Sequence, residues 1–441
     1  MVQRAIACIL GFPIDSLPSK YLGAPLIDSA IKHSTWRTLI EKLDSCLNLW
    51  MHRTLNIASR VVLIKAVLQA MPLYLFSILA VPKLVIKRIK DLQRNFLWGS
   101  TATNHKWALV NWTTVCMSKE KGGIGLRDPN QSNAIMCAKL WWQWLSNTDK
   151  PWATIWIAKY ANYRPQKELI RLIPNAKGSL IWNAAKQHYM LIQHHNFWEV
   201  RNGETARFWT DAWNQMPKLS SILHPLPSCI GEEKQQQTIK QHWTQENAQG
   251  YRQWIQSDRI PRNVELSFRE RLERELQNRH IRHSEGKDIL RWGYKPKGAF
   301  TTSKVYKLIN SNLSPPDLLW GKIWDSGIWP KVSLFLWLVG HQKILTWDRL
   351  RRINYHGPSM CVNCKAQEET LQHLFDSCAI TNQLWEKVSF RCQRRCRVAE
   401  NIINTLCQWK KKPFKSEILN HLWKIIPGLL VWGIWMEIPL S

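Results

Sequence analysis

A short stretch of cysteine and histidine residues has the composition and spacing of a metal site. Cys361 and Cys364 are separated by two residues, eight residues lead to His373, and four more lead to Cys378. Three thiolates and one imidazole are enough to bind a structural zinc ion tetrahedrally. Three unrelated reduced cysteines near a core histidine are the alternative, but both spacings fall within one 18-residue window. We therefore predict a structural Zn²⁺ site made by these four residues.

The predicted zinc segment is acidic, whereas the sequence on either side of it is basic. Residues 365–378 contain one basic side chain, Lys365, against Glu368, Glu369 and Asp376. The flanks carry seven arginines that we predict to contact nucleic acid: Arg349, Arg351, Arg352, Arg391, Arg394, Arg395 and Arg397. We therefore expect the ion to stabilise the fold, and the flanking residues to contact phosphate groups.

The composition indicates a polyanionic partner. The chain has 441 residues and a net charge of +29, from 61 basic against 32 acidic side chains. Such an excess favours nucleic acid first and an anionic membrane surface second, although a merely soluble basic protein is possible. There are 27 tryptophans, and tryptophan serves either as core filler or as a platform for base stacking.

Cysteine usage and hydropathy indicate a nuclear or cytoplasmic protein that is not secreted. Eleven cysteines is an odd number, and the densest group has metal spacing rather than disulfide spacing. We find no signal peptide and no expected transmembrane helix, because Pro427-Gly428 should interrupt the apolar run Ile425–Trp435. We therefore expect no membrane partner.

Apolar residues at helical spacing predict helices over 34–50, 57–71, 83–98 and 130–146. The helix over 83–98 pairs an apolar stripe with a basic one lying about 200° away around its axis. This basic stripe, which we predict to follow a phosphate backbone, consists of Lys83, Lys87, Lys90 and Arg94. A solvated basic face is the alternative for this helix taken alone.

Turn signals suggest two β-hairpins in the middle of the chain. One spans 197–209 with Asn202-Gly203 as its turn, and the other spans 289–301 around residues 295–298. Residues 226–262 are polar and are expected to be a linker or to be poorly ordered. Ser314-Pro315-Pro316 marks a domain boundary, after which an apolar helix and a helix capped by Thr346 lead to the zinc segment. The predicted fold class is mainly α with small β-hairpins (α+β).

Several motifs, in one order along nearly the whole chain, resemble a known family. They are Leu17-Pro-Ser-Lys-Tyr-Leu-Gly23, Leu63-Ile-Lys-Ala-Val-Leu68, Phe96-Leu-Trp-Gly99, Lys121-Gly-Gly-Ile-Gly-Leu-Arg127, Trp329-Pro-Lys331 and the Cys361–Cys378 cluster. Together they resemble the C-terminal part of the reverse transcriptase of plant LINE-type, non-LTR retrotransposons. The resemblance implies a thumb-like helical region at 1–150, a linker region at 151–313, a zinc-binding domain at 314–400 and a truncated tail at 401–441.

The resemblance implies RNA or an RNA/DNA hybrid as the partner, and no small-molecule substrate. It does not bring catalytic residues with it. The chain contains no Asp-Asp pair for the two metals of nucleotidyl transfer, and no ribonuclease H carboxylate cluster follows Ile434-Trp-Met-Glu437. We therefore expect a zinc-binding, nucleic-acid-binding remnant that is not an enzyme. A lone polymerase or nuclease, a zinc-dependent protein–protein module, and a decayed, non-functional retroelement product are the alternatives.

Overall fold

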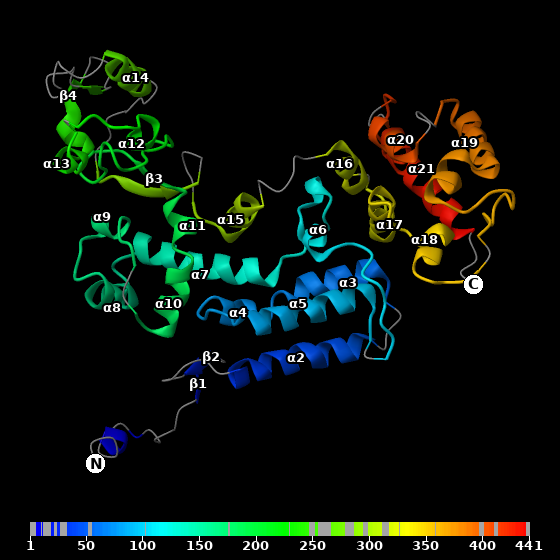
Figure 1. The fold of residues 1–441 in the computed structure, drawn as a ribbon, viewed down its shortest axis with the longest axis horizontal. Helices are drawn as coiled ribbons and strands as arrows, with labels where there is room; N and C mark the ends of the chain where they lie inside the picture. Colours follow the sequence, from blue (N-terminus) through cyan, green and yellow to red (C-terminus); the bar gives the residue numbers. More distant parts are fainter. Residues whose placement is uncertain are drawn as a thin grey trace. The chain divides into compact units, whose positions relative to one another are not determined.

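The structure is a computed structural model of the chain, and it forms two compact units (Figure 1). Unit 1 comprises residues 1–73, 82–131 and 307–441, and unit 2 comprises residues 74–81 and 132–306. The structure describes residues 6–9, 11, 19–21, 24–26, 33–51, 55–101, 103–174, 177–228, 230–246, 252–254, 266–277, 286–293, 299–310, 317–325, 327–357, 359–396, 401–409 and 413–437.

The described part of unit 1 is mainly helical. Its N-terminal segment contains a strand pair followed by helices: β1 (Ser19–Tyr21), β2 (Ala24–Leu26), α2 (His33–Met51), α3 (Ile57–Leu63), the π-helix η1 (Ile64–Leu68), α5 (Lys83–Trp98), α6 (Trp112–Cys116) and the 3₁₀ helix η2 (Lys119–Lys121). Its C-terminal segment contains α16 (Leu318–Trp324), α17 (Pro330–Gly340), α18 (Trp347–Arg352), the π-helix η5 (His373–Ser377), α19 (Ala379–Cys392), α20 (Ile402–Gln408) and α21 (Glu417–Met436).

Unit 2 combines short helices with two small antiparallel sheets. Its helices are α8 (Pro151–Tyr160), α9 (Gln166–Leu169), α10 (Leu180–Gln187), α11 (Met190–Gln193), α12 (Leu219–Ile222), α13 (Glu232–Gln235), η3 (Ile239–His242) and α14 (Leu266–Gln277). Its strands are β3 (Asn196–Glu199), β4 (Trp243–Glu246), β5 (Arg252–Trp254) and β6 (Ile289–Trp292). Helices α4 (Leu73–Phe76), α7 (Pro129–Ser146) and α15 (Thr302–Ile309) each include a boundary between the units. The mainly helical fold class is confirmed.

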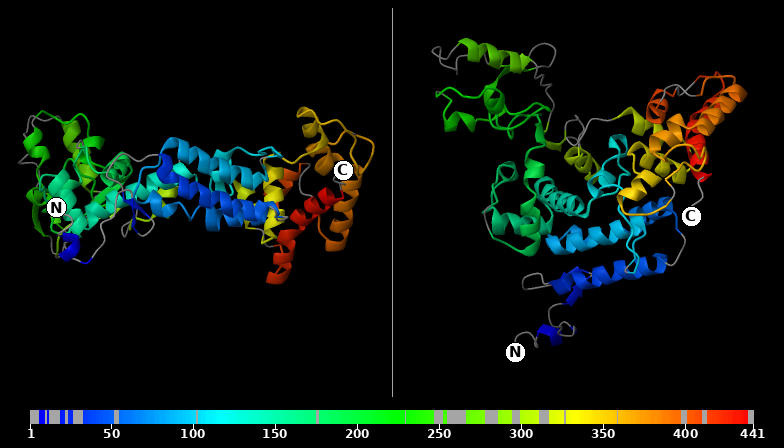
Figure 2. Two further views of the ribbon diagram at one scale, coloured as in Figure 1. Left: turned by 90° about the horizontal axis from the view of Figure 1, so that it is seen from below. Right: turned by 45° about the vertical axis from the view of Figure 1, so that its right-hand side comes forward.

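Helix α5 forms where the apolar spacing predicts it. Val85, Ile89, Leu92 and Phe96 are all buried, and the helix ends at Gly99, whose left-handed φ of 74° closes the last turn. Helices α2 and α5 lie side by side in the views of Figures 1 and 2, and they are in contact. The predicted apolar stripe is therefore a true core face of unit 1.

The glycine-rich loop of residues 121–127 is a packing element of unit 1. The Gly122 carbonyl accepts hydrogen bonds from Trp337 Nε1 and His341 Nε2, both at 2.7 Å. On its other side, Lys65 Nζ donates to the carbonyl of Ile124 at 2.8 Å. The loop therefore joins the helices near residue 65 to α17, which leads toward the zinc segment.

Replacing Gly122 with alanine is expected to destabilise unit 1 by about 2–4 kcal/mol. Gly122 has a φ of 83°, and an added Cβ would lie 2.8 Å from the Trp320 ring. Gly321, inside α16, is a matched control, because a Cβ there meets nothing within 4 Å. Gly321→Ala should increase stability by under about 1 kcal/mol, because alanine favours a helix more than glycine does. Urea denaturation followed by tryptophan fluorescence measures both, and equal midpoints for the two variants would contradict the packing role.

Tryptophans account for much of the core of unit 2. Trp182 is fully buried and its ring lies 5.4 Å from that of Trp141, 5.3 Å from Trp144 and 5.0 Å from Trp156. Tyr160 stacks on Trp182 at 4.2 Å. Edge-to-face and offset contacts of this kind stabilise aromatic clusters beyond their buried area. Here these tryptophans fill a core rather than offering a surface on which bases could stack.

Both predicted hairpins in the middle of the chain are wrong. Strand β3 pairs with β6, with Phe197 opposite Arg291, so the two segments pair with each other instead of folding back locally. Residues 299–301, expected to complete the second hairpin, form no strand. Its predicted turn at 295–298 lies outside the described residues.

The Asn202-Gly203 segment is a loop wrapped around a buried carboxylate rather than a hairpin turn. Asp288 Oδ1 accepts the amides of Arg201 at 2.7 Å and Gly203 at 2.9 Å. Its Oδ2 accepts the amides of Thr205 at 2.9 Å and Ala206 at 3.2 Å. A partner more than 80 residues away therefore sets the conformation that local turn chemistry suggested.

The expectation that residues 226–262 are poorly ordered is wrong for their described part. Ile230 and Ile239 are buried in the core cluster of unit 2, and α13 and η3 lie within this stretch. Residues 247–251 and 255–262 lie outside the described residues, as does the expected boundary at 314–316.

The expectation that Pro427 interrupts the last apolar run is wrong, since α21 continues through it. A proline lacks the N–H that would bond the carbonyl four residues earlier. Here that carbonyl, of Trp423, accepts Trp409 Nε1 at 3.0 Å. By length and composition α21 could cross a membrane, but core helices satisfy the same test, and its buried face here includes Val431 and Ile434.

Candidate metal centre

The four predicted zinc ligands converge at one point of unit 1. Their ligand atoms all lie within 4.8 Å of one another, and Cys364 Sγ is 3.2 Å from His373 Nε2. Zinc–sulfur bonds of about 2.3 Å in a tetrahedron require sulfurs about 3.8 Å apart. The donor set therefore fits zinc in number, chemistry and spacing. Cys361, Cys364, His373 and Cys378 form a site for a structural zinc ion.

A tight turn presents the first two ligands. The Lys365 amide donates to the carbonyl of Cys361 at 2.8 Å, and Lys365 adopts a left-handed φ of 52°. The Cys361 amide in turn donates to the Gln367 carbonyl at 2.8 Å. These bonds close the chain on itself, so both sulfurs face the same side.

A π-helical turn and a helix start present the other two ligands. The wider turn of η5 lets the Cys378 amide reach back to the His373 carbonyl at 2.8 Å. Cys378 is also the N-cap of α19, so the start of that helix fixes its backbone position. Leu374 and Phe375 are buried beneath the turn.

The histidine is oriented by a neighbouring hydroxyl. Ser377 Oγ lies 3.3 Å from His373 Nδ1, and it can accept the proton of that nitrogen. Nε2, which faces Cys364, is then free to bind the metal. A histidine, unlike a cysteine, needs this second contact to fix its tautomer.

The two thiols of the tight turn have different pKa values because their surroundings differ. Burial raises the pKa of Cys361 to about 11. Burial also opposes ionisation of Cys364, but the Ala366 amide, the His373 ring and the Gln367 amide outweigh it and lower the pKa of Cys364 to about 6. Cys364 is therefore ready as a thiolate near neutral pH, whereas a bound cation must displace the proton of Cys361.

The acidic residues of the zinc segment are engaged inside the domain. Glu368 pairs with Arg351 at 2.7 Å, and Asp376 Oδ1 accepts the amide of Ile402, at the start of α20, at 2.6 Å. Glu369 is 1% exposed, and its Oε1 accepts the Trp347 amide at the start of α18 at 3.2 Å. Burial raises the pKa of Glu369. The zinc segment thus fixes the N-termini of the helices that precede and follow it, a role that the sequence did not reveal.

The basic stripe of α5 divides into paired and unpaired cations. Lys90 pairs with Asp128 at 2.9 Å and Arg94 pairs with Asp91 at 2.9 Å. Lys83 and Lys87 are exposed, and neither has an ion pair with any residue that the structure describes. Two of the four predicted contacts are therefore open to an outside anion.

The arginines of α18 are also held within the domain. Besides the Arg351 pair, Arg352 lies 3.7 Å from Asp348, and Arg349 donates to the Gln342 carbonyl. These contacts are partly exposed and contribute little stability each. They nevertheless reduce the charge that α18 offers to a phosphate.

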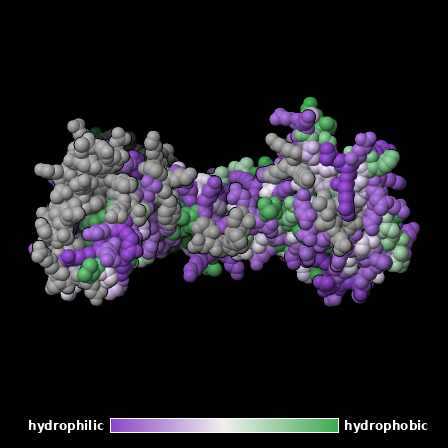
Figure 3. Space-filling view, turned by 90° about the horizontal axis from the view of Figure 1, so that it is seen from above, coloured by the Kyte–Doolittle hydropathy of each residue, from purple (hydrophilic) through white to green (hydrophobic). Residues whose placement is uncertain are grey.

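The arginines at the C-terminal end of α19 and directly after it are more exposed. Arg391 and Arg395 are exposed, while Arg394 lies over the Phe414 ring at 4.6 Å and donates to the Pro413 carbonyl. Arg397 lies outside the described residues. The face of the C-terminal helices visible at the right of Figure 3 is mainly hydrophilic.

A Cys₃His structural zinc domain is the class that this geometry defines. The family described as zinc-binding in reverse transcriptase matches residues 300–385, a range that contains all four ligands. These residues are therefore a reverse-transcriptase zinc-binding domain, which confirms that part of the resemblance seen in the motifs.

Two proteins of Arabidopsis thaliana are similar to this chain. One is named as a candidate ribonuclease H protein, and it is 24% identical over 418 residues, or 93% of this chain and 64% of that protein. The chain therefore spans slightly less than two thirds of that relative's length. The other is an uncharacterised mitochondrial protein, 25% identical over 145 residues, which are 33% of this chain and 92% of that protein. The chain is thus distantly similar to these two plant proteins.

Proposed function

We propose that this chain binds RNA or an RNA/DNA hybrid through basic surfaces of unit 1, with zinc as a structural staple and without polymerase chemistry of its own. The observation that carries the proposal is the engagement of the acidic zinc-segment residues inside the domain. Glu369 and Asp376 bind backbone amides inside the domain, and the exposed Glu368 is paired with Arg351, so the three carboxylates oppose an approaching polyanion less than their number suggests. The net charge of +29 supports the same partner.

The relatives support the proposal at the level of the domain. A zinc-binding domain of reverse transcriptases belongs to proteins that handle RNA and DNA together. The role inferred for this chain is to hold the nucleic acid rather than to extend or cleave it, since residues 1–441 offer no Asp-Asp pair.

The open cations of α5 are expected to contribute more to RNA binding than the paired arginines of α18. The double variant Lys83→Ala/Lys87→Ala should weaken binding of a fluorescein-labelled single-stranded RNA by about tenfold, because the loss of each phosphate contact should weaken binding by about threefold. Fluorescence anisotropy at a fixed salt concentration measures the affinity.

A matched pair of charges serves as the control. Arg351→Ala/Arg352→Ala removes the same charge, but both side chains face Glu368 and Asp348, so the affinity should fall less than about threefold. If the arginine variant loses more affinity than the lysine variant, the assignment of the α5 stripe is wrong. If neither variant changes RNA binding, neither α5 nor α18 belongs to the nucleic-acid surface.

A further inference from the structure

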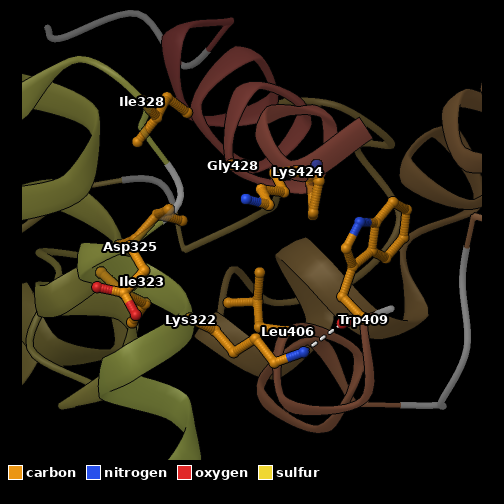
Figure 4. A pocket seen from close by; sticks show the side chains of 10 residues that line it. Lys322, Ile323, Asp325, Ile328, Leu406, Trp409, Lys424 and Gly428 are labelled. Atoms are coloured by element: carbon orange, nitrogen blue, oxygen red, sulfur yellow. Dashed lines mark hydrogen bonds between the residues drawn. The ribbon is translucent and has the colours of Figure 1, made fainter. Parts of the chain in front are cut away.

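A cavity of about 60 Å³ lies in unit 1, where α16, α17, α20 and α21 meet. Its walls are mostly apolar, and they include Ile323, Leu336, Leu406, Trp409 and Pro427. Figure 4 shows these helices bordering the cavity, with Lys322 on α16 and Lys424 on α21. None of the zinc ligands lines it.

Hydrogen bonds and close packing fix the positions of the side chains that line the cavity. Trp409 Nε1 is bound to the Trp423 carbonyl that Pro427 leaves without a partner, so the indole cannot rotate inward without losing that bond. Lys322 Nζ is fixed on the Trp409 carbonyl. Gly428 is packed closely, since an added Cβ there would lie 2.7 Å from Ile328 Cδ1. The cavity is therefore preformed rather than ready to collapse.

The size of the cavity selects a short aliphatic group. One buried water occupies about 10–15 Å³ on this scale, so the cavity holds roughly four to six non-hydrogen atoms. The cavity is smaller than the cavity of about 150 Å³ that is known to accept benzene. A branched group of four or five carbons fits the apolar walls.

The charges at the cavity select an anion beside that aliphatic group. Lys322 and Lys424 line it against one carboxylate, Asp325, which leaves a net charge of +1. Lys424 is half-buried, and its ammonium has no hydrogen bond or ion pair with the residues that the structure describes. We propose that this cavity binds a carboxylate carried on a short branched aliphatic chain, with Lys424 as the counter-ion. This site is independent of the proposed nucleic-acid function.

Methyl NMR of the full zinc-loaded chain, labelled at isoleucine and leucine methyls, tests the proposal. Titration with 4-methylpentanoate should shift the methyl signals of Ile323 and Leu406 saturably, with a dissociation constant of about 1–10 mM, as expected for so few atoms. Lys424→Glu should weaken this binding about tenfold, because attraction becomes repulsion. Lys387→Glu, at an exposed lysine of α19 that does not line the cavity, is the matched control and should leave it unchanged.

Two further probes separate the features of the ligand and its source. The neutral 4-methylpentan-1-ol should bind at least about fivefold more weakly than the acid if the lysines select an anion. The peptide acetyl-Leu-Glu-amide carries the same groups, and tighter binding than the free acid would identify a protein segment as the natural source. The proposal would be overturned if neither 4-methylpentanoate nor the peptide gave saturable shifts. Equal binding of the alcohol and the acid, or an unchanged affinity of Lys424→Glu for the acid, would also overturn it.

Discussion

Replacement of Cys364 with serine is expected to abolish stoichiometric zinc binding and to unfold the segment around the site. The hydroxyl of serine is a poor zinc ligand, and the three remaining donors leave the tetrahedron incomplete. Structural zinc contributes roughly 10–16 kcal/mol of apparent binding free energy in small peptides, far more than the other contacts of this segment can replace. The affinity for zinc should therefore fall at least about 100-fold.

The effect should extend from the ligands to the helices that they organise. Glu369 holds the start of α18 and Asp376 holds the start of α20, so both helix starts depend on the zinc segment. Hydrogen exchange should become fast from Thr346 through Cys378 and at the start of α20, while unit 2 keeps its protection. Cys46→Ser, in α2 and outside the cluster, is the control and should change neither zinc content nor exchange. A Cys364→Ser chain that keeps native protection here without zinc would show that the ion is not a staple.

Replacement of Asp288 with alanine is expected to destabilise unit 2 by about 3–5 kcal/mol. Asp288 is 8% exposed, and its carboxylate accepts hydrogen bonds from four backbone amides at 2.7 to 3.2 Å. Alanine leaves these donors without the acceptor that holds the loop closed. Two of them, on Gly203 and Ala206, belong to buried residues and so cannot turn to water without a rearrangement.

Chemical denaturation followed by tryptophan fluorescence measures this loss, since Trp209 and Trp213 are buried in the same core cluster. Asp288→Asn keeps the shape but replaces one acceptor with a donor, so it should lose nearly as much stability as alanine. Asp149→Ala, at an exposed acidic residue of unit 2, should stay within about 0.5 kcal/mol of the parent chain. A Asp288→Ala chain as stable as that control would mean that the loop holds its shape without the carboxylate.

The zinc site could be predicted from the sequence because its information is local. All four ligands lie within 18 residues, and the spacing of cysteine and histidine reports the turn and helix start that present them. The same holds for α5, whose apolar residues repeat at helical spacing and are buried where expected. In both cases the pattern and the physical cause lie in one continuous segment.

The features that the sequence did not reveal depend on contacts between distant segments. Asn202-Gly203 is a strong local turn signal, yet Asp288 decides its conformation from more than 80 residues away. Lys90 and Arg351 look like free cations in a basic stretch, and only folding brings Asp128 and Glu368 beside them. Local spacing predicts which residues share a face, but not which partner neutralises them.

The salt dependence of RNA binding tests most directly whether this chain, with its structural zinc site, binds phosphate groups. The dissociation constant for a single-stranded RNA of about 20 nucleotides is measured by anisotropy between about 50 and 300 mM KCl. Contacts from Lys83, Lys87 and Arg391 alone predict a slope of log affinity against log salt of about −2 or steeper, at about −0.7 for each phosphate. A slope near zero, or no binding at the lowest salt, would contradict a nucleic-acid-binding function.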